Sequence, residues 1–260
     1  MKLTRCAMTA LVLSCATPVG AQTIFDATLA EPGQKTSEVS TAGLKDIVDR
    51  QSAVLLDARP PLEYAISHIP GALNVAPQPG RPAHLYISDV AEIARLLGGA
   101  KDRPLVLYCN GPFCGKTKRL SAELVDGGYT SVRRYQVGAP GWRTLSGRAM
   151  QTELAAVAYL RGDSTAVWID ARQPDLFAAQ TARGARNIPA SGLRDGKDQG
   201  VMKDAKDDGR LPMDDHNTRI IVFGGDARAT QAVADAIASE AFHNVSFIAA
   251  PVQEVLRAGQ

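Results

Sequence analysis

A cysteine-containing loop in the first half of the chain has the composition expected of a nucleophilic site. Residues 105–119 read LVLYCNGPFCGKTKR, in which an apolar run of strand length ends directly before Cys109. A helix is predicted after the loop, so the Cys109 thiol would face free backbone N–H groups and the positive end of the helix dipole. Both features favour the thiolate, which is the reactive form of cysteine.

Basic residues follow the same loop and add positive charge beside it. Lys116, Lys118 and Arg119 should favour the thiolate further, and Lys116 is the candidate for binding an anionic donor. Together with the loop amides they would hold an anionic sulfur group attached to the cysteine, as a covalent sulfur carrier requires. With Cys109 as the predicted catalytic residue, the predicted substrate-binding residues are Asn110, Gly111, Phe113, Gly115, Lys116, Thr117 and Arg119.

Spacing disfavours two other kinds of catalytic loop that follow a strand in the same way. A phosphate-binding P-loop needs four residues between its glycines, whereas three residues separate Gly111 from Gly115. A cysteine phosphatase would need an arginine six positions after Cys109, and that position is Gly115. The sequence therefore favours neither nucleotide binding nor phosphatase chemistry.

The composition of the chain fits a folded protein without a metal or a polyanionic partner. The chain has 260 residues, of which 45% are hydrophobic and 22% charged, so it can bury a core. Its formal net charge of +2, without a long run of Lys and Arg, gives no indication of nucleic-acid binding. The four cysteines and four scattered histidines form no zinc-binding pattern. We expect no metal and no organic cofactor.

An internal repeat with an offset of 113 residues sets the domain organisation. Residues 54–75 align without gaps with residues 167–188, and nine of these 22 positions are identical. The same offset later pairs Thr117 with Thr230. One offset held over such a length indicates duplication of a whole domain rather than a short repeat.

Each copy contains the same order of short apolar strands and helices. Short apolar runs that alternate with helices predict parallel strands covered on both faces. The predicted fold is therefore α/β, with two tandem domains, each a parallel sheet flanked by helices. The predicted strands are 53–56, 105–108 and 131–135, then 166–169, 220–223 and 244–248, and the predicted helices include 44–50, 118–126, 154–160 and 229–239.

The first 21 residues are expected to be a secretory signal peptide. Lys2 and Arg5 precede a mostly apolar stretch, and Val19-Gly20-Ala21 has the small-residue spacing that a signal peptidase needs. The apolar stretch is shorter than the ~20 residues that span a bilayer, so no transmembrane segment is expected. Cleavage after Ala21 predicts a periplasmic or secreted protein, and the alternative is a lipoprotein anchored at Cys15.

The remaining boundaries follow from the repeat. Residues 22–37 are predicted to be an extended leader, residues 38–148 a domain with the catalytic loop, and residues 149–260 a domain without the cysteine. Residues 192–218 form a charged insertion that we expect at the surface and partly helical.

Several motifs together resemble the tandem rhodanese-like sulfurtransferase family. They are Asp57-Ala-Arg59, His68-Ile-Pro-Gly-Ala72, Tyr108-Cys109 and Gly138-Ala-Pro-Gly-Trp142. The resemblance implies two rhodanese-like domains, in which Cys109 takes a sulfane sulfur from a donor such as thiosulfate and becomes a persulfide. The sulfur then passes to a thiol or cyanide acceptor, and a protein can also serve as the acceptor. The resemblance implies no cofactor.

The second copy departs from this pattern at the nucleophile. Gly224 stands where the cysteine would, so this copy cannot form a persulfide there and is expected to be a structural or binding partner. Asp57 and Arg59 nevertheless recur as Asp170 and Arg172. Because the pair is retained without a nucleophile, we interpret it as a structural ion pair. His68 is expected to order its turn by hydrogen bonds, and Trp142 to anchor the core.

The loop of the first copy is longer than its counterpart, and it holds a second cysteine. Cys109 and Thr117 are eight positions apart, whereas Gly224 and Thr230 are six apart, the usual family spacing. The opening of the longer loop should differ in shape from that of the usual family loop, so the donor need not be thiosulfate. Cys114 either resolves a Cys109 persulfide through an internal disulfide, protects Cys109 from over-oxidation, or is a small loop residue.

Two alternative functions remain open at this stage. The chain could be a periplasmic thiol redox protein that uses Cys109 and Cys114 as a dithiol, because a five-residue separation closes when the loop folds back at Gly111-Pro112. It could also be a non-catalytic sulfur-carrier or binding module in which the second copy and its charged insertion dock a partner.

Overall fold

The computed structural model describes residues 23–76 and 89–260. The predicted signal peptide and the alternative anchor at Cys15 lie outside these residues. In the first copy the elements are β1 (Ser37–Glu38), α1 (Thr41–Arg50), β2 (Val54–Asp57), α2 (Pro61–Ile66), β3 (Leu73–Asn74), α3 (Asp89–Leu96), β4 (Leu105–Tyr108), α4 (Gly115–Asp126), β5 (Val132–Tyr135) and α5 (Gly138–Leu145).

The second copy repeats this order of strands and α-helices, with two 3₁₀ turns among them. Its elements are β6 (Met150–Gln151), the 3₁₀ turn η2 (Leu154–Ala156), α6 (Val157–Arg161), β7 (Val167–Asp170), α7 (Pro174–Ala179), β8 (Arg186–Asn187), the 3₁₀ turn η3 (Ala190–Gly192), α8 (Gly200–Asp207), β9 (Ile220–Gly224), α9 (Ala227–Ser239), β10 (Val245–Pro251) and α10 (Val252–Ala258). The helix α8 lies within the insertion that was expected to be partly helical.

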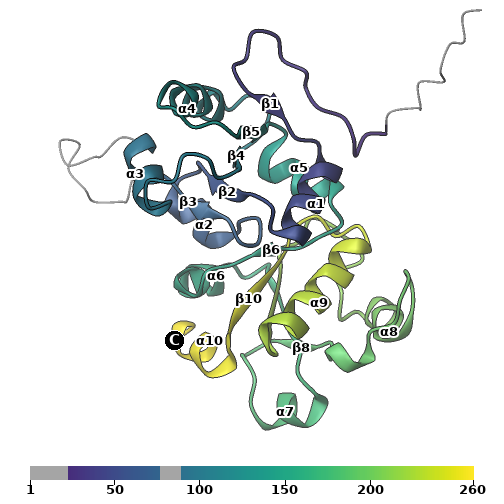
Figure 1. Cartoon of the computed structure of the whole chain (residues 1–260). Coiled ribbons are helices and arrows are strands. Elements are labelled where there is room, and N and C mark those ends of the chain that lie inside the picture. The colour runs from purple at the N-terminus through teal and green to yellow at the C-terminus, as the bar shows by residue number, and fades with distance from the viewer. Residues whose placement is uncertain (1–22, 77–88) are drawn as a thin grey trace, which may run out of the picture.

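Two parallel five-stranded sheets confirm the predicted fold class. Their strand orders are β1-β5-β4-β2-β3 and β6-β10-β9-β7-β8, so corresponding strands occupy corresponding places. Every described strand pair within them is parallel. Figure 1 shows the two copies lying one above the other, with the first in purple to teal. The edge strands β1 and β6 were not predicted, because two-residue strands carry no apolar run.

The central strand of the first sheet is buried on both faces, as expected for a parallel sheet. Alternate side chains of β4 point to opposite faces: Val106 and Tyr108 pack in one cluster with Leu44, while Leu105 and Leu107 pack in another with Leu120. The amphipathic helices α1 and α4 therefore close the two faces of the sheet. This packing fixes the position and direction of the main chain at the end of β4, directly before Cys109.

The two copies are joined by a short stretch of main chain that hydrogen-bonds to both. The strand β6 pairs with β10 in the second sheet, and its Gln151 also exchanges two backbone hydrogen bonds with His68 of the first copy, at 2.9 and 2.8 Å. Next to it, the Thr152 hydroxyl donates to the Ile66 carbonyl at 2.8 Å, and the Glu153 N–H donates to the Ala65 carbonyl at 2.8 Å. The end of α2 is thus fixed against the second copy.

His68 lies buried at this junction, with only 1% of its surface exposed. Its Nδ1 lies 3.0 Å from the Tyr64 carbonyl oxygen, and its ring stacks on the Tyr64 ring at 4.0 Å between centroids. Its Nε2 lies 3.5 Å from Glu153. Burial lowers the pKa of His68 from its ordinary 6.5, against the opposing effects of the Tyr64 carbonyl and the Glu153 carboxylate. The predicted ordering role is confirmed by the bond to Tyr64.

Acidification should destabilise the protein through His68. Because the folded-state pKa lies below the unfolded value, the unfolded chain binds the proton first as the pH falls, and stability is lost below about pH 6.5. Above that pH the imidazole is neutral in both states and its contribution is constant. Urea unfolding across this range should show a slope in the wild type that His68→Gln flattens. An unchanged slope in the variant would assign the pH dependence to other groups.

Candidate functional site

Cys109 stands at the carboxyl end of the central strand β4 and is buried, with 7% of its surface exposed. Its carbonyl oxygen accepts a hydrogen bond from the Ala139 N–H at 2.9 Å, which ties it to the start of α5. Ligand sites in parallel sheets lie at this edge, where loops meet helix N-termini. The structure therefore places the predicted nucleophile where such a site is expected.

The two cysteines of the loop are joined by a disulfide bond between Cys109 and Cys114. Their Cα atoms are 6.3 Å apart, within the ordinary range for a disulfide. The loop folds back at Gly111, whose φ of +116° favours glycine, and the Cys114 N–H donates to the Gly111 carbonyl at 3.0 Å. Cys114 is thus paired with the predicted nucleophile Cys109, a pairing that the sequence alone left open.

Gln136 holds the loop in place from the end of β5. Its buried Nε2 donates to the carbonyl oxygens of Pro112 at 3.2 Å and Cys114 at 3.3 Å. Its Oε1 accepts from the Thr117 hydroxyl at 3.1 Å and from Arg134 at 3.0 Å. Sequence reasoning missed Gln136. The sequence did hold a signal for it: Gln136 is a polar residue directly after β5, at the same edge of the sheet as Cys109 after β4.

Gly138 allows the loop to approach α5 closely. A Cβ atom on Gly138 would lie 2.4 Å from the Cys109 carbonyl oxygen and 2.5 Å from the Gly111 nitrogen. Its φ of +66° also favours glycine. A matched position is Gly147, which has a φ of +64° but nothing within 4 Å of a Cβ atom.

Gly138→Ala should therefore disturb the cysteine loop, whereas Gly147→Ala should not. Gly147→Ala should cost about 1–2 kcal/mol of stability for the left-handed backbone alone. Gly138→Ala should cost more, because the clash is with backbone atoms of the loop, and it should slow closure of the disulfide. Urea unfolding and thiol titration after oxidation measure the two effects. Equal costs at the two positions would show that the close approach has no energetic consequence.

The basic residues beside the loop each lie near a carboxylate. The Arg119 guanidinium is 3.2 Å from Asp89 and 2.8 Å from Glu123, and the Lys116 ammonium is 4.0 Å from Asp89. Lys118 forms an ion pair with Glu31 of the leader. Asp89 and Glu31 come from segments distant in sequence, whereas Glu123 lies one turn further along the same helix as Arg119. Together they largely offset the local excess of positive charge expected from residues 116–119. Binding of an anionic donor by Lys116 stays a prediction.

Three other predicted binding residues lie on the outer side of the loop. The Asn110 amide donates to the Glu63 carboxylate of α2 at 2.6 Å. The Phe113 side chain is fully exposed at 101% of its reference surface, and Gly115 begins α4 at an exposed position. Phe113 thus contributes nothing to the core and lies between the two cysteines in the sequence.

The Asp57–Arg59 ion pair packs against Tyr108 at the end of β4. The guanidinium donates to the Asp57 carboxylate at 2.5 and 3.0 Å and to the Ser67 carbonyl at 2.6 Å, and both side chains are almost wholly buried. The Arg59 guanidinium carbon lies 5.6 Å from the centre of the ring of Tyr108, the residue that precedes Cys109. The Tyr108 hydroxyl accepts from the Ile69 N–H at 3.0 Å, and burial raises its pKa.

These contacts confirm the predicted structural role of the pair. Trp142 is also confirmed as a core residue, with 1% of its surface exposed. Arg143, one residue later, was not predicted: it donates to the Ser67 hydroxyl, and burial, followed by the nearby Arg59 charge, lowers its pKa to about 10.

The equivalent position in the second copy has no room for a nucleophile. Gly224 has a φ of +100°, and an added Cβ atom would lie 2.6 Å from Asp170 and 3.2 Å from Arg172. Asp226 caps the following helix, because its carboxylate accepts from the Ala229 N–H at 2.9 Å. In the first copy the corresponding cap is Cys114, which makes no side-chain capping bond.

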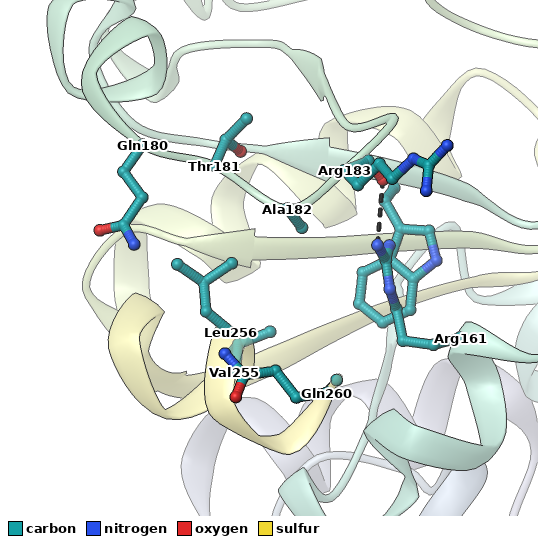
Figure 2. A pocket seen from close by; sticks show the side chains of 10 residues that line it. Arg161, Gln180, Thr181, Ala182, Arg183, Val255, Leu256 and Gln260 are labelled. Atoms are coloured by element: carbon teal, nitrogen blue, oxygen red, sulfur yellow. Dashed lines mark hydrogen bonds between the residues drawn. The ribbon is translucent and has the colours of Figure 1, made fainter.

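A separate cavity of about 270 Å³ lies in the second copy, and none of the predicted site residues lines it. The Arg161 guanidinium lies 4.8 Å from the Trp168 ring centre and donates to the Arg183 carbonyl at 3.0 Å. Figure 2 shows this bond at one end of the cavity, with Gln180 and Thr181 at the other. The cavity belongs to the copy that lacks the cysteine.

Residues 23–76 and 89–260 contain no group of three or more His, Cys, Asp or Glu residues that is placed to hold a metal ion. Within the same residues, no helix has both the length and the apolar character needed to cross a membrane.

Comparison with known proteins gives matches over both copies. A family model for the rhodanese-like domain matches residues 40–145 and 154–255. An HTH-type transcriptional regulator of Mycobacterium tuberculosis is 30% identical over 112 residues, and this match spans 43% of each protein. The chain therefore corresponds to less than half the length of that curated relative.

Two solved structures are similar to the chain at low identity. One is SseA from Escherichia coli, described as a 3-mercaptopyruvate sulfotransferase, at 23% identity over 84% of this chain and 99% of that one, with a TM-score of 0.36. The other is a thiosulfate sulfurtransferase from Pseudomonas aeruginosa, at 20% identity over 82% of this chain and 43% of that one, with a TM-score of 0.35.

Proposed function

Because the chain belongs to the rhodanese-like domain family, which matches both of its halves, we propose that it is a sulfurtransferase with Cys109 as its nucleophile. It would move a sulfane sulfur from a donor such as thiosulfate to a thiol or cyanide acceptor. The observation that carries the proposal is the position of Cys109 at the carboxyl end of the central strand, at the start of the loop that leads to α4.

The proposed reaction has two displacement steps. A Cys109 thiolate attacks the outer sulfur of thiosulfate, the sulfur–sulfur bond of the donor breaks, and sulfite leaves with the bonding electrons. An acceptor thiolate or cyanide then attacks the outer sulfur of the Cys109 persulfide and restores the thiolate. Because Cys109 is bonded to Cys114, the disulfide must be reduced before the first step.

The fold supplies the environment of the thiolate once the disulfide is open. The amides at the start of α4 and the dipole of this twelve-residue helix favour an anion at the loop. Gln136 keeps the loop in place through the Pro112 and Cys114 carbonyls, whose bonds do not involve the sulfur atoms. The second copy has no nucleophile and acts as the partner against which α2 is fixed.

A donor panel tests the proposal. Fully reduced protein would be treated with thiosulfate or 3-mercaptopyruvate and analysed by mass spectrometry, and thiocyanate formation would be measured with cyanide as acceptor. We expect thiocyanate from the wild type and one added sulfur, about 32 Da, on Cys109 of the variant Cys114→Ser, whose loop has no second thiol to displace that sulfur. No adduct and no thiocyanate with any donor would contradict the proposal and favour a non-catalytic binding module.

The proposal includes export of the protein. Residues 1–21 have the features of a cleaved signal, and the compartment outside the cytoplasm is oxidising enough to sustain a disulfide. Fractionation of cells that express the full chain, with the mass of the product, tests this statement. A periplasmic product that begins at Gln22 is expected, whereas a lipidated product that begins at Cys15 would favour the anchored form.

A further inference from the structure

The second cysteine of the loop is placed to react with whatever is bound to the first. Cys109 and Cys114 are within bonding distance across the closed loop, with their Cα atoms 6.3 Å apart. The loop is two residues longer than its counterpart in the second copy, which runs from Gly224 to Thr230 with neither cysteine. The longer loop therefore provides a sulfur partner for Cys109 that the duplicated domain lacks.

The supports of the loop do not depend on the disulfide. The Cys114 N–H donates to the Gly111 carbonyl, and Gln136 donates to the Pro112 and Cys114 carbonyls. These bonds hold the backbone of Cys114 beside Cys109 when the disulfide is reduced. Cys114 is also the N-cap residue of α4 and makes no side-chain capping bond, so the helix amides can stabilise its thiolate.

We propose that Cys114 resolves the Cys109 persulfide, so that the protein releases the sulfane sulfur as hydrogen sulfide. The inference rests on the proposed persulfide at Cys109. The Cys114 thiolate attacks the Cys109 sulfur, a bond forms between these two sulfurs, and the bond to the outer sulfur breaks. The outer sulfur leaves as hydrosulfide with the electron pair and keeps the proton of the persulfide. The outer sulfur is reduced, and the two cysteine sulfurs are oxidised to the disulfide seen in the structure.

Turnover then requires an external dithiol as reductant. Cys109 is buried, whereas Cys114 is partly exposed, so the incoming thiolate would attack the Cys114 sulfur and release Cys109 as the leaving thiolate. The second thiol of the reductant then frees Cys114 and carries the two electrons away as a disulfide. The net reaction converts a sulfane sulfur and a dithiol into hydrogen sulfide and a disulfide.

A single-turnover experiment tests this activity in the full chain. Reduced protein, freed of the reductant, would be mixed with thiosulfate and, in a parallel arm, with glutathione persulfide. Sulfide and sulfite would be quantified, and the protein mass recorded. In the wild type we expect about one sulfide per chain and a protein lighter by two hydrogens, with Cys109 and Cys114 bonded. Cys114→Ser should stop at the persulfide, heavier by about 32 Da, and release at least about tenfold less sulfide.

The outcomes separate this inference from the proposed function. A wild-type protein that keeps the added sulfur on Cys109 and leaves Cys114 as a free thiol would overturn the inference while supporting sulfur transfer. Neither sulfite nor an added sulfur in Cys114→Ser, with either donor, would overturn the proposed function itself. Circular dichroism of the reduced proteins checks that the variant is folded.

Discussion

Cys109→Ser should abolish sulfur transfer, with a fall in turnover of at least about a thousandfold. A serine hydroxyl is far less nucleophilic toward sulfur than a thiolate and cannot carry a sulfane sulfur as a persulfide. Neither the second copy, with Gly224 at the equivalent position, nor Cys114 should replace it. The measurement is thiocyanate formation from thiosulfate or 3-mercaptopyruvate in the presence of a reductant.

Cys114→Ser is the matched control for this variant. Each substitution removes one half of the same disulfide, so both variants lose the same covalent link between residues 109 and 114. Their stabilities should therefore be similar, and a difference in activity with cyanide as acceptor reports on the nucleophile. Retention of full activity in Cys109→Ser together with its loss in Cys114→Ser would move the nucleophile to Cys114.

Asp57→Ala should cost about 3–5 kcal/mol of folding stability, because it leaves a buried arginine without its counter-ion. The Asp57 and Arg59 side chains are 0% and 3% exposed, so the guanidinium is almost wholly shielded from water. Burial opposes the charge of Arg59, but the hydrogen bonds that Arg59 donates to Asp57 and the attraction between the two charges together raise its pKa. Asp57→Ala removes these contributions, and an arginine with an ordinary pKa of about 12.5 or more remains protonated at neutral pH. The Arg59 guanidinium must then either stay buried without a counter-ion or move toward solvent and disrupt the packing around it.

The second copy supplies the control, Asp170→Ala. Asp170 accepts equivalent bonds from Arg172, but the Arg172 side chain is 12% exposed, so its charge can turn toward solvent. We expect a smaller loss of stability at Asp170. Urea unfolding of the two variants measures the difference, and Asp57→Ala combined with Arg59→Met should recover part of the loss. Equal losses would mean that burial of the arginine does not determine the cost.

The two variants should also differ in their effect on sulfur transfer. Arg59 lies against the Tyr108 ring and holds the Ser67 carbonyl, next to the strand end that carries Cys109. Its displacement should therefore lower the activity of the folded fraction, whereas Asp170→Ala should leave the strand β4 unaffected.

Much of the fold follows from sequence pattern. The offset of 113 residues predicts the duplication, and apolar runs predict the central strands. β4 has the predicted bounds, β5 and β9 differ by one residue at one end, and β2 and β7 are shifted by one residue. Strands of this kind are signalled locally, because burial on both faces demands continuous apolar residues. The helices α1 and α4 begin three residues earlier than predicted, since helix starts depend on capping geometry.

The sequence by itself determined the family, the two-domain α/β architecture and the structural role of Asp57 with Arg59, and it led to the proposal of Cys109 as the single nucleophile. Each of these depends on residue types at fixed spacing within one copy. Tertiary structure decided the pairing of Cys109 with Cys114, the support of the loop by Gln136, and the offsetting of the nearby basic charge by Asp89 and Glu31. These contacts join segments that the folded sheet brings to one edge, and local sequence does not encode the distances between them.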